Sequence, residues 1–198
     1  MSKAYLTIDD GPTKITPQII DYLSSKSIIP NMFFTGEQIE GCFEEGVYAL
    51  KKGAIVGNHS YNHPSFNELT FDESIIEIEK QEKILEELYK MAGVERKYKV
   101  FRFPYGNKGD QNKEAIQNYL LKNQFCRIDD SEIDFEWYKL HKLNEDIDVF
   151  WTFDFLEYQL KDHNGLTFDH ILHRIHDKEP ATGGFLLDES AHHIVLIH

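Results

Sequence analysis

The sequence lacks several features that would assign it to common classes of protein. It has only two cysteines in 198 residues, too few for a disulfide framework, and we expect both Cys42 and Cys126 to be structural. It has no apolar run near the roughly 20 residues that span a membrane. Basic residues are few, 21 against 34 acidic ones, and the resulting charge of −13 argues against nucleic acid and anionic membrane surfaces as partners.

Linkers, repeats and low-complexity tracts are also missing, which predicts a single domain over residues 1–198. The N-terminal residues contain no charged, apolar and cleavage regions in series, so no signal peptide is visible. As written, the chain is therefore expected to be cytoplasmic, or extracytoplasmic if a leader has been removed. The sequence does not indicate an oligomeric state. The 10 Tyr and 14 Phe exceed what a core of this size requires, so some rings are expected to line a cleft.

Short apolar runs alternate with helical patterns along the chain. The clearest helical pattern covers 71–91, with Asp72 as the expected cap and Gly93 as the expected stop. An irregular acidic segment at 129–144 is typical of an insertion or a lid rather than of a core element. The strand-like runs lie at 4–8, 28–35, 54–57, 99–103, 149–153 and 193–197, and weaker helical patterns at 16–25, 37–52, 113–123 and 167–176.

This alternation predicts an α/β fold with a parallel sheet. Polar side chains follow five of the runs, so each would lie at the carboxyl end of a different strand. A barrel gathers such ends around one cavity, whereas an open sheet gathers them only near its switch point. We therefore expect a distorted or incomplete (β/α) barrel, similar to a TIM barrel, of about seven parallel strands, because eight units typically need roughly 250 residues. The side chains concerned are Asp9, Asp10, His59, Arg102, Asp154 and His198.

Two adjacent carboxylates, Asp9 and Asp10, follow the first run and precede the turn residues Gly11 and Pro12. Because side chains alternate along a strand, the two carboxylates are expected to point in different directions. One would then be available to a metal and the other to a substrate water. Taken alone, the same pattern is also typical of a solvated turn.

Two histidines, His59 and His63, are four residues apart, a spacing at which both rings face one point on a brief helical turn ended by Pro64. Paired surface histidines are common. Together with Asp10, however, they form a His-His-Asp set with open coordination positions, as in catalytic metal sites. Such a metal lowers the pKa of bound water toward ~7 and polarises a carbonyl.

Two further side chains sit at strand ends. Arg102 is suited to holding a carboxylate by a forked hydrogen bond, although a salt bridge at the rim would have the same sequence pattern. His198 follows the last apolar run, and a lone histidine there would ordinarily be structural. Both become candidate functional residues only because they lie beside the other strand-end residues.

In this order and spacing, the segments resemble the polysaccharide deacetylase family, also called the NodB homology domain or carbohydrate esterase family 4. The resemblance extends along the whole chain, and its motifs occur in register. The matching segments are Thr7-Ile8-Asp9-Asp10, His59-Ser60-Tyr61-Asn62-His63, Arg102-Phe103-Pro104-Tyr105 and Leu196-Ile197-His198.

This resemblance implies a metal-dependent hydrolase that removes N-acetyl groups from an amino sugar or an N-acetylated polysaccharide, with an activated water as nucleophile. It implies one divalent metal, zinc first, with cobalt and nickel as alternatives. The implied roles are metal ligands for Asp10, His59 and His63, general base for Asp9 oriented by Arg102, general acid for His198, oxyanion stabilisation for the Tyr105 N–H, and lining of the acetyl pocket for Leu196.

The chain departs from the family at its fourth motif, Asp-x-x-Asp-Trp, which corresponds here to Asp154-Phe155-Leu156-Glu157-Tyr158. Either Glu157, one methylene longer than aspartate, or Asp154 would hold His198. Tyr158 would form a smaller and more polar wall of the groove than tryptophan. The sequence also ends on His198, where family domains normally continue, so we expect the native chain to be longer.

Two other functions remain open. One is a deformylase or another hydrolase of non-peptide C–N bonds from the same superfamily. The other is a catalytically weak glycan-binding module, which predicts loss of Asp9 or His198, although both are present. A glycosidase with paired carboxylates needs no metal and leaves the two histidines unexplained.

Overall fold

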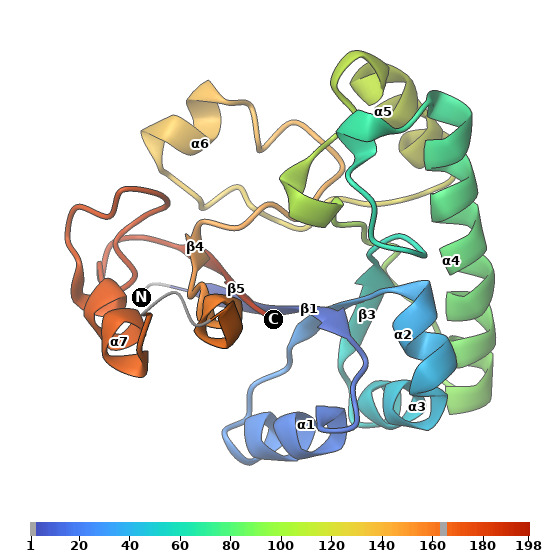
Figure 1. The fold of residues 1–198 in the computed structure, drawn as a ribbon, viewed down its shortest axis with the longest axis horizontal. Helices are drawn as coiled ribbons and strands as arrows, with labels where there is room; N and C mark the ends of the chain where they lie inside the picture. The colour runs from blue at the N-terminus through green and yellow to red at the C-terminus, as the bar shows by residue number, and fades with distance from the viewer. Residues whose placement is uncertain (1–2, 163–165) are drawn as a thin grey trace.

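The computed structural model describes residues 3–162 and 166–198, which form an α/β fold around a parallel sheet (Figure 1). The described part of the sheet has five strands in the order β3-β2-β1-β5-β4, and every neighbouring pair is parallel. The first strand of the chain is therefore central. The strands are β1 (Ala4–Gly11), β2 (Asn31–Phe34), β3 (Ile55–Asn58), β4 (Phe153–Asp154) and β5 (His193–Ile197).

Beyond β3 the sheet continues without a regular ladder. Asn58 forms a single parallel bridge to Phe101. The next backbone groups bond to side chains instead: Phe103 N donates to Asp148 Oδ1 (3.2 Å), and Arg102 Nε donates to Val149 O (2.5 Å). The expected class, an α/β fold with a parallel sheet arranged as an incomplete barrel, is confirmed. The described residues form five strands rather than about seven, since the run at 99–103 forms only an isolated bridge and the run at 149–153 contributes only to the two-residue strand β4.

Helices α1 to α4 pack against β1, β2 and β3 on one face of the sheet, in a shared hydrophobic core. β2 shows how a strand serves two cores, since successive side chains face opposite ways. Met32 and Phe34 belong to the core under these helices, whereas Phe33 faces the other side, with Tyr138 and Ile194. The helices are α1 (Thr16–Ser25), α2 (Gly36–Gly41), α3 (Phe43–Lys51), α4 (Phe71–Ala92), α5 (Lys113–Lys122), α6 (Glu136–Leu140) and α7 (Phe168–His176).

The longest helix, α4, differs from expectation at its start. Its N-cap is Thr70, whose hydroxyl accepts a bond from Glu73 N while the Glu73 carboxylate accepts one from Thr70 N. Asp72 therefore lies inside the first turn, because this capping box already satisfies the free N–H groups. Gly93 ends the helix with φ +68°, as predicted. Cys42 interrupts the expected helix at 37–52 and divides it into α2 and α3.

The segment 129–144 is part of the core rather than an insertion or a lid. Ile133 and Tyr138 are buried to 4% and 1% exposure. Both belong to the same hydrophobic cluster as Phe33 and Ile194, on the side of the sheet that α1 to α4 leave open. The sequence does not reveal that the segment is buried, because its acidic residues are interspersed with the apolar ones.

Three further features complete the description: the cysteines, the character of the helices and the 3₁₀ turns. Cys42 and Cys126 form no disulfide. In the described residues no helix combines the length and apolar character that crossing a membrane requires. The 3₁₀ turns cover Phe66–Glu68, Pro104–Gly106, Asp110–Asn112 and Glu157–Asp162.

Candidate active site

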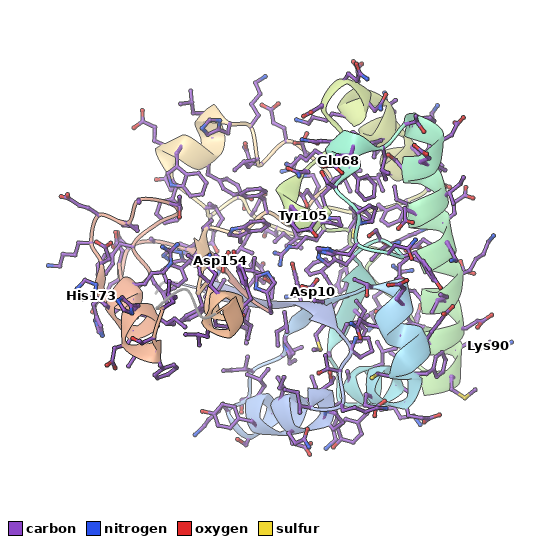
Figure 2. All side chains as sticks on the ribbon, in the orientation of Figure 1. Asp10, Glu68, Lys90, Tyr105, Asp154 and His173 are labelled. Carbon is purple, nitrogen blue, oxygen red and sulfur yellow. The ribbon has the colours of Figure 1, made fainter. Side chains whose placement is uncertain are left out.

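The carboxyl edge of the sheet carries a cavity of about 330 Å³. Figure 2 shows Asp10, Tyr105 and Asp154 toward the middle of the molecule, whereas Lys90 and His173 lie at its periphery. Of the side chains expected at the site, only Arg102 and Glu157 do not line this cavity, and both contact a residue that does. The lining residues are Asp9, Asp10, His59, His63, Phe103, Tyr105, Trp151, Asp154, Tyr158, Leu196 and His198.

Asp9 and Asp10 face the same cavity, so the expectation that they point in different directions is wrong. The reason is an irregularity at the end of β1, where the register with β2 shifts between Ile8 and Gly11 and Asp10 takes a left-handed φ of 61°. Such a bulge re-aims a side chain and breaks the simple alternation. As a result, Asp9 Oδ2 and Asp10 Oδ1 each lie 3.6 Å from His59 Nε2.

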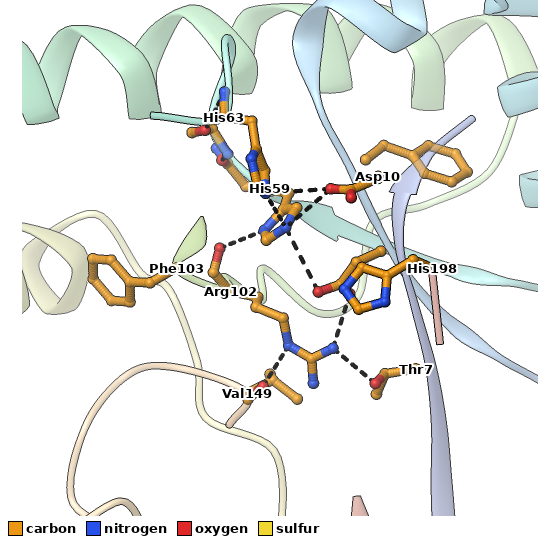
Figure 3. Close-up of polar contacts among 12 residues, drawn as sticks. Thr7, Asp10, His59, His63, Arg102, Phe103, Val149 and His198 are labelled. Atoms are coloured by element: carbon orange, nitrogen blue, oxygen red, sulfur yellow. Dashed lines mark hydrogen bonds and ion pairs between the residues drawn. The ribbon is translucent and has the colours of Figure 1, made fainter. Parts of the chain in front are cut away.

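His59 and His63 also converge without the helical turn that their spacing suggested. The residues after β3 form an irregular loop in which Ser60 and His63 have φ values of 63° and 58°. His63 N donates to Ser60 Oγ (3.1 Å), which closes this loop tightly. The result is the same convergence by a different backbone path, and the two Nε2 atoms lie 3.2 Å apart (Figure 3).

The donor atoms of Asp10, His59 and His63 lie within 4.8 Å of one another, as a metal site requires. His59 Nδ1 lies 2.8 Å from the Arg102 carbonyl, which can only accept, so Nδ1 carries the proton and Nε2 presents a lone pair to the cavity. Burial, followed by the charge of His63, lowers the pKa of His59 to about 3, so its ring is neutral. Asp10 Oδ1 is buried without a hydrogen-bond partner. These features fit a divalent cation.

Four residues with left-handed backbone cluster around this cavity. They are Asp10, Ser60, His63 and Tyr105, with φ values between 57° and 63°. Such conformations cost of order 1–3 kcal/mol each for residues other than glycine and persist only where the surroundings hold them. The Tyr105 ring packs edge-on against His63 at 4.7 Å between centroids. The surrounding structure therefore holds these four residues in an unfavourable backbone conformation, and this conformation directs their side chains.

Arg102 lies beneath the cavity and is fully buried, which excludes the salt bridge at the rim considered from the sequence. Its Nη1 donates to Asp9 Oδ1 (2.8 Å) and to Thr7 Oγ1 (2.7 Å), and the guanidinium lies 4.6 Å from the centroid of the Phe33 ring. Burial raises the pKa of Asp9, and the charge and hydrogen bond of Arg102 oppose that rise. One Asp9 oxygen is thus fixed to Arg102 while the other faces the cavity.

On the opposite wall, His198 pairs with Glu157 rather than with Asp154. His198 Nδ1 lies 3.4 Å from Glu157 Oε1, and His198 N donates to the same oxygen. Asp154 Oδ1 instead accepts a bond from Leu156 N (2.8 Å). Burial alone would lower the pKa of His198, but the Glu157 bond, with the charges of Asp9 and Glu157, raises it above its usual 6.5. The Tyr158 ring packs edge-on against the imidazole at 4.6 Å between centroids.

Glu77 on α4 is a residue of the site that the sequence did not reveal. Its Oε2 accepts bonds from Tyr61 N (3.0 Å) and Asn62 N (2.8 Å), and its Oε1 accepts from Asn62 Nδ2 (2.8 Å). These groups belong to the loop between the two histidines. In the sequence Glu77 is one of many acidic residues on an amphipathic helix, and no signal separates it from its neighbours.

Comparison with known proteins places this geometry in a family. The profile described as Polysaccharide deacetylase matches residues 2–123, more than half of the chain. Peptidoglycan-N-acetylglucosamine deacetylase of Bacillus cereus is 36% identical over 116 residues, which cover 58% of this chain and 38% of that protein. Peptidoglycan-N-acetylmuramic acid deacetylase PdaA of Bacillus subtilis is 25% identical over 175 residues, covering 87% of this chain and 56% of that protein. The chain thus spans well under two thirds of these relatives.

Solved structures agree in fold. A crystal structure of a peptidoglycan N-acetylglucosamine deacetylase superposes with a TM-score of 0.62 at 23% identity, covering 99% of this chain and 71% of that one. A CE4 family pseudoenzyme from Bacillus anthracis superposes with a TM-score of 0.67 at 20% identity, covering 100% of this chain and 54% of the other. At such identities the likeness concerns the fold alone, whereas the sequence profile decides membership. The chain belongs to the polysaccharide deacetylase family.

Proposed function

We propose that this chain is a metal-dependent hydrolase that removes N-acetyl groups from an N-acetylated amino-sugar glycan. One observation carries the proposal: a set of metal-binding side chains, a carboxylate bound to a buried arginine and an imidazole bound to a carboxylate share one cavity. Acyl hydrolysis needs these three functions, namely an electrophile, a base and an acid. The relatives named above as deacetylases of peptidoglycan sugars support the choice of substrate class.

Asp10, His59 and His63 would hold the metal. The neutral His59 ring offers the Nε2 lone pair, and Asp10 Oδ1, which has no hydrogen-bond partner, offers a second donor atom. A divalent cation in this position would polarise the substrate carbonyl and lower the pKa of a water. We propose zinc, with cobalt and nickel as alternatives, because a donor set of two imidazoles and one carboxylate suits all three.

Asp9 is the proposed general base. Its Oδ1 is fixed by Arg102, and its Oδ2 faces the cavity, where it can accept a proton from the attacking water. The opposing effects on its pKa suit a base, because burial makes the carboxylate more basic while the charge and hydrogen bond of Arg102 favour its ionised form. Arg102 thus orients the base and does not itself need to touch the substrate.

His198 is the proposed general acid, and Glu157 orients it and favours its protonated form by raising its pKa. A protonated imidazole on the wall opposite the metal ligands can give its proton to the departing amine. The Tyr105 N–H is the proposed donor to the developing oxyanion. Leu196 and Tyr158 line the same cavity and would bound the space for the acetyl methyl group.

The direct test is release of acetate from N-acetylglucosamine oligomers of increasing length by the zinc-loaded protein. We expect hydrolysis that exhaustive chelation abolishes and added metal restores. Simple acetamides and formylated amines belong in the same screen. Turnover of these small amides with no action on any sugar would overturn the glycan assignment in favour of another C–N hydrolase, and full activity after chelation would overturn the metal dependence.

A further inference from the structure

The wall of the cavity that carries His198 holds a second cluster of groups able to bind a metal. Asp154, Glu157 and His198 each offer one ligand atom, and these atoms lie within 4.8 Å of one another, the same convergence as in the proposed catalytic metal site. Asp154 and His198 line the cavity of about 330 Å³, and Glu157 contacts His198. An ion held by this second cluster would therefore lie at the wall of the space that the substrate enters.

The carboxylates of the second cluster have little positive charge to balance them. Among the side chains that the structure describes, His198 is the only one that forms an ion pair with Glu157, and none forms one with Asp154. Arg174 approaches Asp154, but its Nε donates to the backbone oxygen (2.7 Å). Glu157 Oε2 is buried with no hydrogen-bond partner, as is Asp10 Oδ1 in the first cluster. A buried oxygen without a partner is unfavourable, and a bound cation would satisfy it.

The local backbone brings the three side chains together. In the ladder between β4 and β5, Asp154 pairs with Leu196, so His198 follows two residues later at the same edge of the sheet. Asp154 Oδ1 accepts a bond from Leu156 N (2.8 Å), and Leu156 has a left-handed φ of 57°. This turn directs Glu157 back toward His198, whose N donates to Glu157 Oε1. The cluster is thus formed by the fold and not by chance proximity of long surface side chains.

We propose that Asp154, Glu157 and His198 form a second and weaker site for a divalent transition-metal ion, and that this ion inhibits the hydrolase. One imidazole and two carboxylates suit zinc, although the first cluster has two imidazoles. The second site is the weaker one because the ion must replace the contact between His198 Nδ1 and Glu157 Oε1 (3.4 Å). The binding depends on this cluster alone, whereas the inhibition rests on the proposed function.

The expected inhibition follows from the role of His198. A histidine binds a metal as the neutral imidazole, so a coordinated His198 is no longer the imidazolium that protonates the departing amine. Activity should therefore rise as zinc fills the first site and fall again as zinc fills the second. General acid catalysis contributes about 10²–10⁴-fold, so saturation of the second site should lower kcat by at least about 10²-fold.

Binding can be measured without turnover. Equilibrium dialysis of the parent against increasing free zinc should show one ion per chain and then a weaker second ion. Asp154→Asn removes the charge of one ligand but keeps an oxygen for the bond from Leu156 N, so the turn is retained. It should weaken the second ion by at least about tenfold and leave the first unchanged. Asp169→Asn is the matched control, because Asp169 is exposed on α7 and belongs to neither cluster.

Two results of the dialysis would overturn the proposal. One is a single ion per chain at every zinc concentration. The other is a second ion that Asp154→Asn binds as tightly as the parent does, which would place that ion elsewhere on the chain.

Inhibition is measured as the activity of each protein at excess zinc divided by its own activity at one equivalent of zinc. We expect half-inhibition of Asp154→Asn to need at least about tenfold more zinc than that of the parent or of Asp169→Asn. Magnesium at the same concentrations controls for ionic strength, because it prefers six oxygen ligands and keeps its water. Equal inhibition of Asp154→Asn and the parent would refute the inhibitory role.

The outcomes separate this inference from the proposed function. If the chain hydrolyses no sugar but binds two zinc ions, and Asp154→Asn weakens only the second, the second metal site stands and the deacetylase assignment fails. If acetate release rises with zinc to a plateau and dialysis finds one ion per chain, the deacetylase assignment stands and the second metal site is refuted.

Discussion

The two walls of the proposed catalytic cavity are built in different ways: the metal side carries the proposed ligands Asp10, His59 and His63, and the acid side carries the proposed acid His198. On the metal side, His59 follows a strand paired on both edges and is 2% exposed, and the 22-residue helix α4 braces its loop through Glu77. On the acid side, Asp154 belongs to a two-residue strand, Glu157 to a 3₁₀ turn, and the His198 side chain is 23% exposed. Only the metal side lies within residues 2–123.

The two walls differ in the interactions that position their side chains. The metal side is fixed through its backbone, because two main-chain N–H groups of its loop donate to the Glu77 carboxylate and two of its residues, Ser60 and His63, are left-handed. A side-chain pair fixes the acid side, where one glutamate holds one imidazole. We therefore expect substitutions on the metal side to abolish activity and substitutions on the acid side to reduce it in a graded way.

The largest effect is expected for His63→Ala. It removes one of three metal donors, and because the electrophilic contribution of a metal is several kcal/mol, activity should fall by at least about 10³-fold. Metal content after dialysis and acetate release measure the two losses. His173→Ala is the control, because His173 is exposed on α7 and far from the site (Figure 2). A His63→Ala protein that keeps stoichiometric metal would contradict the ligand assignment.

Asp9→Asn is expected to separate binding from turnover. The amide keeps the size of the carboxylate but accepts a proton poorly, so kcat should fall by about 10²–10⁴-fold, the usual contribution of a general base. Metal content should remain near that of the parent protein, since Asp9 is not one of the three clustered donors. A turnover number equal to the parent's would show that another group is the base.

Glu77→Ala tests whether the helix α4 maintains the metal side. Its removal leaves Tyr61 N and Asn62 N without their acceptor, and the loop can then relax from its left-handed shape. Loss of such an outer support typically weakens metal affinity by about 10–100-fold. Titration of the apo protein with zinc measures the affinity. Glu86→Ala, exposed on the same helix, is the control, and Glu77→Gln, which keeps one oxygen acceptor, should restore part of the affinity.

The sequence predicted the placement of most reactive side chains well. His59 and His198 directly follow parallel strands and Asp154 ends one, so their positions at one edge depend only on strand order and direction, which apolar runs reveal. The family motifs added their grouping around one cavity. Burial of Arg102 was not predictable, because an arginine–carboxylate pair has the same sequence pattern at the rim and in the interior, and the expected forked bond is a single bond from Nη1 to Asp9 Oδ1.

What could not be predicted depends on local backbone shape and on distant contacts. The bulge that turns Asp10 toward Asp9, and the left-handed residues between His59 and His63, have no periodic signature in the sequence. Glu77 bonds to residues 15 and 16 positions away in the sequence, and this pairing exists only in three dimensions. Burial of Tyr138 depends on which face of the sheet the first four helices leave open.

The smallest effect, and the sharpest test of the comparison, is expected for Glu157→Gln. Glu157 raises the pKa of His198 above 6.5, and a general acid must be protonated, so the basic limb of kcat/KM in the parent should lie above pH 6.5. Loss of the carboxylate charge should shift this limb to lower pH and reduce activity at neutral pH, and each pKa unit of the measured shift corresponds to a factor of ten. A pH–rate profile measures both. Asp154→Asn should shift the limb less, since Asp154 bonds to Leu156 N instead.

The same pair makes a pH-dependent contribution to stability, whose sign follows from its two shifts. The pKa of His198 is raised and, although burial opposes it, the bonds from His198 lower the pKa of Glu157 below its usual 4.5. The contribution of the pair is therefore complete between about pH 4.5 and 6.5, is lost as pH rises through the folded pKa of His198, and is lost as pH falls through that of Glu157.

If Glu157→Gln leaves the basic limb of the pH–rate profile unmoved while Asp154→Asn shifts it, Asp154 and not Glu157 orients His198. The contrast between a wall fixed by backbone and one fixed by a single glutamate would then fail.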